Sequence, residues 1–164
     1  MNFWLKYLLI DLTLGVCLAL LLRRFVCVLC YVKGKSMMDT LQDGEVLFAL
    51  RRHGALKRFD IVICRYPKRK GLFVKRVIGL PGERIAVEED VLLVNGEPVA
   101  ENFPRRKHLT PMTERIVDEG AYFLMGDNRT ASKDSRSVGC IAEDQILAVG
   151  KCVVFPFRKI RRIG

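Results

Sequence analysis

The sequence predicts an all-β fold, a mostly antiparallel barrel or sandwich, behind a single N-terminal transmembrane helix. Three observations predict this arrangement. The chain begins with a strongly apolar segment, and the rest carries many short β-branched and aromatic segments separated by turn residues. No long helical periodicity appears after residue 33.

The N-terminal segment is apolar over residues 7–22. The run is interrupted only by a carboxylate, a hydroxyl and a glycine, at Asp11, Thr13 and Gly15. A bilayer core needs about 20 helical residues, and residues 3–22 reach that length if Lys6 lies at the interface. A cleaved signal peptide fits less well, since Arg23 and Arg24 follow the run in place of a small-residue cleavage site.

This segment divides the chain into a membrane anchor over residues 1–24 and a β-rich domain over residues 25–164. Positive charges lie at both ends of the apolar segment: Lys6 and the terminal amine at one end, Arg23 and Arg24 at the other. The positive-inside rule therefore does not set the orientation of the anchor.

Strands are predicted wherever β-branched or aromatic residues run between turn signals such as Asp43-Gly44 and Asn95-Gly96. The predicted strands cover residues 25–31, 45–50, 60–64, 72–78, 84–88, 91–94, 122–125 and 146–149. We see no internal repeat and no low-complexity tract.

The composition favours some classes of partner and excludes some classes of site. With 28 Lys and Arg against 18 Asp and Glu, the net charge of +10 favours anionic partners. No Cys-x-x-Cys pair stands near a histidine pair, because His53 and His108 are the only histidines, and this excludes a zinc finger. Three of the six cysteines lie in or beside the anchor, and free thiols are the favoured state of the other three.

Three polar segments stand out, over residues 34–41, 74–83 and 126–139. The first contains Ser36-Met37-Met38-Asp39-Thr40-Leu41, the second Lys75-Arg76 and Gly79-Leu80-Pro81-Gly82-Glu83, and the third Gly126-Asp127-Asn128-Arg129 and Asp134-Ser135-Arg136. Each segment alone is weak evidence, because a serine in a turn is usually a turn former and a lysine in a basic strand usually faces solvent. A phosphate-binding loop at residues 79–83 is disfavoured because Pro81 lacks an N–H.

Together, and in this order behind an anchor, the three segments resemble those of type I signal peptidases. That family has a Ser-Met-x-Pro-Thr-Leu box, a Lys-Arg-x-x-Gly-x-Pro-Gly-Asp box and a Gly-Asp-Asn-Arg…Ser…Asp-Ser-Arg box. The resemblance covers about residues 18–154, and the single short anchor is most similar to the compact Gram-positive members.

The resemblance implies a Ser-Lys dyad, with Ser36 as nucleophile and Lys75 as general base. Ser132 matches a serine that hydrogen-bonds the lysine and orients it. The residues that match structural support of the site are Asp134, Arg136, Gly126 and Asp127. Lys75 serves as a base only when neutral, and burial beside apolar neighbours lowers a lysine pKa. Strand alternation should send Arg76 to the opposite face.

The implied activity is cleavage of N-terminal signal peptides from exported preproteins, after small residues at −1 and −3, through an acyl-enzyme. No metal or cofactor is implied, and the catalytic domain is expected on the extracytoplasmic side of the plasma membrane. Met37 and Met38 are expected to line the substrate surface and to touch lipid. The backbone N–H of Ser36 is expected in the oxyanion hole.

Two departures from the family pattern affect the first segment. Gly34 stands where some relatives have a serine that adds an oxyanion donor, so the second donor is open. Asp39 stands in place of the family proline. We expect its carboxylate to point to solvent, because the proline shapes the backbone.

Anionic lipid headgroups are a further expected partner. Basic residues crowd residues 51–76, and residues 155–163 mix bases with apolar side chains. Nucleic acid is not expected, since no recognisable binding motif is present.

Three other functions stay open from the sequence. One is a catalytically impaired relative, inactivated through Asp39, that serves as an assembly factor or chaperone for surface proteins. The others are a self-cleaving Ser-Lys protease like the SOS repressors, and a non-enzymatic basic protein of the membrane surface. The impaired relative is disfavoured because the dyad residues and Ser132 are all present. The self-cleaving protease is disfavoured by the membrane anchor.

Overall fold

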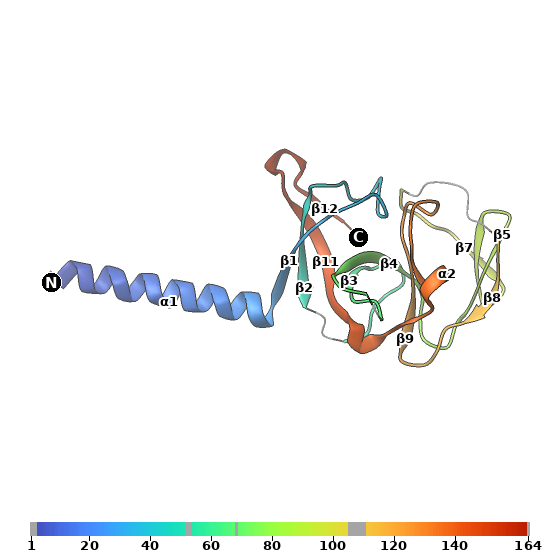
Figure 1. Ribbon diagram of the computed structural model, residues 1–164, viewed down its shortest axis with the longest axis horizontal. Coiled ribbons are helices and arrows are strands. Elements are labelled where there is room, and N and C mark those ends of the chain that lie inside the picture. Colours follow the sequence, from blue (N-terminus) through green and yellow to red (C-terminus); the bar gives the residue numbers. More distant parts are fainter. Residues whose placement is uncertain (1–2, 52–53, 68, 105–110, 164) are drawn as a thin grey trace.

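The computed structural model describes residues 3–51, 54–67, 69–104 and 111–163. One long helix, α1 (Phe3–Phe25), projects from one end of a β-rich body (Figure 1). Its stretch Phe3–Leu21 has a mean hydropathy of 1.8, and none of it is buried against the rest of the chain. The predicted all-β fold behind one apolar helix is therefore confirmed.

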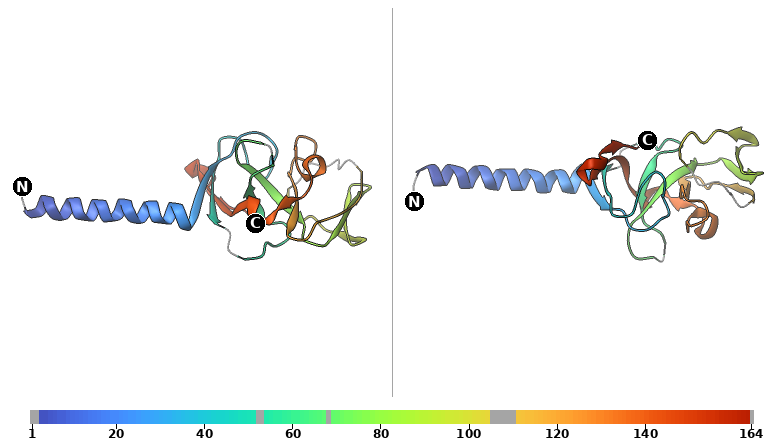
Figure 2. Two further views of the ribbon diagram at one scale, coloured as in Figure 1. Left: turned by 60° about the horizontal axis from the view of Figure 1, so that its bottom comes forward. Right: turned by 90° about the horizontal axis from the view of Figure 1, so that it is seen from above.

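Two antiparallel sheets form the body. The larger sheet runs in the order β1-β2-β11-β3-β4-β9-β10, with β12 also paired to β11, and it curls on itself (Figure 1). Its strands are β1 (Cys27–Tyr31), β2 (Val46–Arg51), β3 (Ile61–Cys64), β4 (Phe73–Gly79), β9 (Ala121–Met125), β10 (Ile141–Ala142), β11 (Ile146–Phe155) and β12 (Arg161–Arg162). The smaller sheet has the order β7-β6-β5-β8 and lies at the end far from α1 (Figure 2).

The smaller sheet consists of β5 (Arg84–Glu88), β6 (Val91–Val94), β7 (Glu97–Val99) and β8 (Met112–Ile116). The helical turns of the body are α2 (Ser135–Val138), η1 (Glu143–Gln145) and η2 (Phe157–Lys159).

The core explains why the central strands are so apolar. Every residue of β3 and of β9 is buried, because both faces of these strands are covered. By contrast, β11 alternates between buried and partly exposed residues over its first half, as expected for a strand with one covered face. Lys75 and Arg76 lie in β4 between these covered strands, so the two basic side chains enter a buried environment.

The predicted strands agree closely with the observed ones where apolar alternation is regular. The bounds of β5 and β6 are those predicted, and β11 continues six residues further. The sequence analysis missed β8, because four of its five residues are exposed and three of them are polar. None of the six cysteines forms a disulfide bond within the residues that the structure describes. Both histidines lie outside the described residues.

Candidate active site

Ser36 lies in the connection between β1 and β2. We call residues 34–42 the Ser36 loop. Its turn is closed by internal backbone hydrogen bonds, since the N–H of Leu41 donates to the carbonyl of Met37 at 2.8 Å and that of Met38 donates to Lys35 at 3.1 Å. The Ser36 side chain is half-buried. Its backbone N–H has no hydrogen-bond partner in the part of the chain that the structure describes.

Lys75 reaches Ser36 from the middle of β4. Its Nζ lies 2.8 Å from Oγ of Ser36 and 2.9 Å from the carbonyl oxygen of Val74. Lys75 is 2 % exposed. Burial lowers the pKa of its ammonium below the ordinary lysine value, whereas the charges of Asp134, Cys64 and Asp127 act to raise it.

The Val74 carbonyl gives the lysine a defined orientation. A carbonyl oxygen only accepts hydrogen bonds, so an N–H of Lys75 must point at Val74. When the amine is neutral, its lone pair is free to accept a proton from the Ser36 hydroxyl, 2.8 Å away. The arrangement therefore has the geometry that general-base activation of a hydroxyl requires.

The loop after β9 brings the third segment against Ser36. The backbone N–H of Asn128 donates to the Ser36 carbonyl at 3.0 Å, and its side-chain amide donates to the Lys35 carbonyl at 3.0 Å. A Cβ built on Gly126 would lie 2.4 Å from the Ser36 carbonyl oxygen. Only glycine fits there, so Gly126 permits the close approach of the two loops.

Asp134 and Arg136 form an ion pair that holds this loop together. Nε and Nη2 of Arg136 donate to the two oxygens of Asp134, each at 2.8 Å. Asp134 also caps α2 and accepts the N–H of Gly126 at 3.0 Å. Burial raises the pKa of its carboxyl, but the hydrogen bonds from Arg136 and Gly126 bring the net pKa below the ordinary value.

Ser132 differs from the expectation. Its hydroxyl lies close enough to the Asp134 carboxylate to help lower that pKa. It nevertheless makes no hydrogen bond of regular geometry within the described residues, and both contacts of Lys75 Nζ go elsewhere. The expected Ser132–Lys75 hydrogen bond is thus absent in this structure. A Cβ on Gly126 would lie 2.2 Å from Oγ of Ser132, so the side chain packs directly on Gly126.

A buried ion pair lies behind the dyad. Arg76 donates from Nε and Nη2 to Asp127 at 2.8 and 2.7 Å, and the two side chains are 4 % and 0 % exposed. Asp127 also accepts the hydroxyl of Thr40, which belongs to the Ser36 loop. The Phe103 ring lies 3.9 Å from the Arg76 guanidinium. Alternation along β4 thus sends Lys75 and Arg76 to opposite faces, as predicted. Lys75 faces Ser36, whereas Arg76 faces Asp127.

The sequence analysis missed the roles of Thr40 and Asn128. It expected Asp127 to support the site but did not predict that Arg76 is its partner. Their only sequence signal was their position inside the three polar segments, which does not reveal the partners of each side chain.

The expectation for Met37 was wrong. Met37 is 2 % exposed and packs in a core cluster with Leu41, Leu47 and Ile61. Its side chain points from the Ser36 loop into the core, not to the surface. The physical reason is the gain of about 1.5–3 kcal/mol from burying a thioether side chain. Met38 is half-buried, and its expected contact with substrate stays a prediction.

Asp39 is exposed, in agreement with the expected solvent-facing carboxylate. Its backbone φ is +84°, a left-handed conformation that aspartate tolerates better than most residues. A proline ring fixes φ near −65° and cannot adopt this value. The Ser36 loop therefore follows a path that the family proline would not allow.

Replacing Asp39 with proline is accordingly expected to lower activity by about tenfold or more, because a loop displacement separates Ser36 from Lys75. Asp39→Asn, which keeps left-handed backbone accessible, should retain activity. Cleavage rates of the two variants measure this. Unchanged or higher activity in Asp39→Pro would contradict the left-handed turn.

Comparison with known proteins identifies the family. The model of the family "Signal peptidase, peptidase S26" matches residues 4–155. The chain belongs to this signal peptidase family. It is thus a serine protease of the signal peptidase type.

Individual signal peptidases agree with this assignment. The signal peptidase I T of Bacillus subtilis is 42 % identical over 163 residues, which cover 91 % of this chain and 84 % of the relative. A signal peptidase I of Bacillus licheniformis is 39 % identical and covers 97 % and 91 % of the two chains. The crystal structure of a signal peptidase I from Enterococcus faecalis matches with a TM-score of 0.52 and 31 % identity, over 58 % of this chain and 97 % of that chain.

Proposed function

We propose that this chain is a membrane-anchored serine endopeptidase that removes N-terminal signal peptides from exported preproteins, with Ser36 as nucleophile and Lys75 as general base. The observation that carries the proposal is the 2.8 Å contact between Lys75 Nζ and Ser36 Oγ. The burial of Lys75, with the lowered pKa that follows, supports a neutral amine at that position.

The reaction proceeds in two steps. Neutral Lys75 takes the hydroxyl proton of Ser36 as Oγ attacks the scissile carbonyl carbon, and the resulting ammonium protonates the departing amine. This step forms an acyl ester on Ser36 and releases the mature protein. Lys75, neutral again, then takes a proton from the water that attacks the ester carbonyl carbon. The C–Oγ bond breaks, Lys75 returns the proton to Oγ of Ser36, and the signal peptide leaves with a free carboxylate.

The Ser36 N–H is the proposed oxyanion donor. It has no partner within the described residues, and Asn128 fixes the carbonyls on both sides of it. Gly34 has no hydroxyl to offer as a second donor. Ser132 is proposed to orient Lys75 after a rotation of its hydroxyl, and the lack of a regular partner leaves that hydroxyl available.

The anchor places this site close to the membrane. The 19-residue segment Phe3–Leu21 spans about 28 Å as a helix, close to the thickness of a bilayer core. β1 begins two residues after α1 ends, so there is no long linker between helix and domain. We place the domain on the extracytoplasmic side, where signal peptides emerge, and assign it a preference for small residues at −1 and −3.

The turn between β11 and β12 is the proposed lipid contact. It lies at the same end of the body as α1 (Figures 1 and 2). Three of its apolar side chains are exposed, Phe155 by 48 %, Phe157 by 77 % and Ile160 by 60 %, and Arg158 and Lys159 stand between them. Such a mixture suits the boundary between acyl chains and anionic headgroups.

The proposed function is tested with the full-length enzyme in mild detergent and a preprotein with an Ala-x-Ala junction. We expect one cut at the junction, none with Ser36→Ala, and strongly reduced cleavage when leucine replaces the alanine at −1. A preprotein that the wild type leaves intact, while a Bacillus signal peptidase cleaves it in parallel, would favour the assembly-factor function instead.

A further inference from the structure

We propose that Arg161 is a positioning residue for the Ser36 nucleophile, acting from β12 through the end of the Ser36 loop. The inference rests on the proposed catalytic role of Ser36 and extends it to a residue outside the three polar segments.

The guanidinium of Arg161 joins the Ser36 loop to Glu45 through three hydrogen bonds. Nη2 donates to the Thr40 carbonyl at 2.7 Å, and Nη1 and Nη2 each donate to one carboxylate oxygen of Glu45 at 2.8 Å. Glu45 is 1 % exposed, and its Oε2 also accepts the N–H of Gln42 at 2.9 Å. One planar fork thus joins β12 to both the last turn of the loop and the residue before β2.

The hydrogen bonds of Arg161 are connected to Ser36 through a short path of backbone contacts. Two hydrogen bonds fix Thr40. Arg161 donates to its carbonyl oxygen, and its hydroxyl donates to the carboxylate of Asp127. The Thr40 N–H in turn donates to the carbonyl of Met37, the residue next to Ser36, at 3.1 Å. Asn128 fixes the other end of the loop, so Arg161 and Asn128 together hold the turn that carries the nucleophile.

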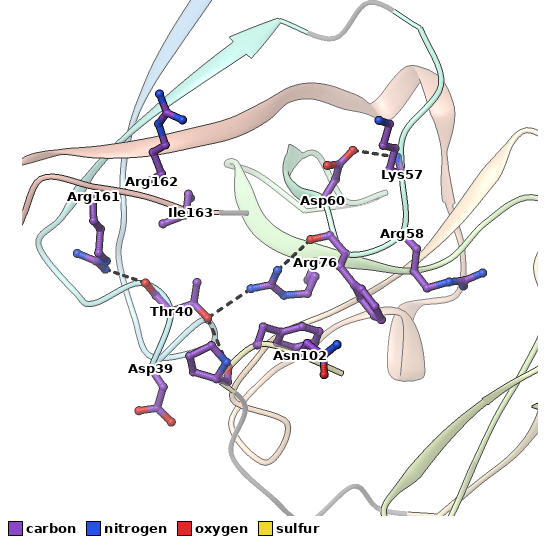
Figure 3. A pocket seen from close by; sticks show the side chains of 13 residues that line it. Asp39, Thr40, Lys57, Arg58, Asp60, Arg76, Asn102, Arg161, Arg162 and Ile163 are labelled. Atoms are coloured by element: carbon purple, nitrogen blue, oxygen red, sulfur yellow. Dashed lines mark hydrogen bonds between the residues drawn. The ribbon is translucent and has the colours of Figure 1, made fainter. Parts of the chain in front are cut away.

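Figure 3 shows this arrangement from the side of a cavity of about 650 Å³, which β12 and the Ser36 loop border. Arg161 points at Thr40, and Arg76 approaches the Thr40 hydroxyl from the opposite side. The neighbouring Arg162 also lines the cavity, but its side chain is exposed and makes no ion pair within the described residues. It therefore provides a matched control.

The electrostatics favour the same role. Burial raises the pKa of the Glu45 carboxyl, but the hydrogen bond from Arg161 and further contacts bring the net pKa below the ordinary value. Glu45 therefore stays charged and needs its partner. The Glu45 side chain is 2 % exposed and that of Arg161 is 36 % exposed, so losing Arg161 leaves a buried carboxylate without its guanidinium partner. The loop end should therefore move when Arg161 is lost.

The test compares full-length Arg161→Ala, Arg161→Lys and Arg162→Ala in detergent with the same preprotein. We expect kcat to fall about 10- to 100-fold in Arg161→Ala with KM nearly unchanged, because misplacement affects the chemical step. Added methylguanidine should restore part of this kcat. Arg162→Ala should behave as wild type.

The lysine variant keeps the test decisive if Arg161→Ala unfolds. Arg161→Lys retains the charge beside Glu45, but its single nitrogen cannot replace the planar fork that joins Glu45 and Thr40. We expect a near-normal melting temperature with a reduced kcat. A normal kcat in Arg161→Lys, or a loss that follows only the unfolded fraction and resists methylguanidine, would overturn the positioning role. A wild type that does not cleave would instead refute the proposed function.

Discussion

Replacing Lys75 with methionine is expected to abolish cleavage, with kcat falling by about 10⁴-fold. Methionine has a similar length and remains compatible with the buried position, so the protein should stay folded while the base is lost. Steady-state cleavage of the preprotein, with circular dichroism on the same samples, measures both properties. Near-normal activity in a folded Lys75→Met protein would exclude Lys75 as the base.

A Lys75→Arg variant distinguishes two possible roles of the lysine, a general base and a positive charge beside Ser36. A guanidinium remains protonated at every accessible pH, so it can donate a hydrogen bond to Ser36 but cannot accept its proton. Lys75→Arg is therefore expected to be as inactive as Lys75→Met. If it retained activity, a positive charge near Ser36 would be sufficient.

If Lys75 is the base, it should also control how cleavage depends on pH. Burial lowers the pKa of Lys75, so kcat/KM of the wild type should rise with pH and level off below the ordinary lysine pKa of about 10.4.

Stability should follow the same titration. Between the folded pKa of Lys75 and the ordinary value, the unfolded chain binds a proton that the folded chain lacks, so the free energy of unfolding rises with pH. Lys75→Met lacks this contribution. Relative to wild type, its stability advantage should be largest below the folded pKa and shrink as the pH rises through the window. Denaturant titrations at several pH values measure this difference.

Replacing Gly126 with alanine should be the most damaging change that touches no reacting group. The added Cβ would lie 2.2 Å from Oγ of Ser132 and 2.4 Å from the Ser36 carbonyl oxygen, distances at which atoms must move. Because Gly126 separates the two serine-bearing loops, we expect about a 100-fold loss of kcat and a destabilisation of about 1–3 kcal/mol. Cleavage kinetics and thermal unfolding measure both effects.

Gly96→Ala is a control for the loss of a glycine far from the site, at a position where the added Cβ strains the backbone but meets no neighbour. Gly96 has φ +84°, and its added Cβ would meet no atom within 4 Å. This variant should lose about 1–2 kcal/mol through the left-handed backbone but keep its kcat. A wild-type kcat in Gly126→Ala would show that the two loops are not in tight contact.

The sequence predicted the parts of this molecule that local pattern controls. Regular alternation gave β5 and β6 with their observed bounds, and the sides of β4 taken by Lys75 and Arg76 followed from the same rule. Met37 was misplaced because an apolar residue beside a nucleophile suits a substrate surface and a core equally well. Only the tertiary packing of the turn distinguishes them.

Long-range partners could not be predicted for a different reason. Glu45 and Arg161 are far apart in the sequence, and nothing around either residue signals a carboxylate buried against a guanidinium. The rotamer of Ser132 depends on a contact with Gly126 that only the folded chain defines.

The strand order of the larger sheet also sets when the enzyme becomes active during its synthesis. β11 lies between β2 and β3, with Ala49 paired to Gly150 and Val62 to Val149. β2 and β3 are synthesised early, but they are joined through β11, which is synthesised late. Pairing between strands so far apart in the sequence forms slowly. The nascent chain cannot complete the sheet before β12 has been made, and Arg161, which binds the Thr40 carbonyl, belongs to that strand. A protease built in this order stays inactive while most of its own chain is still being assembled.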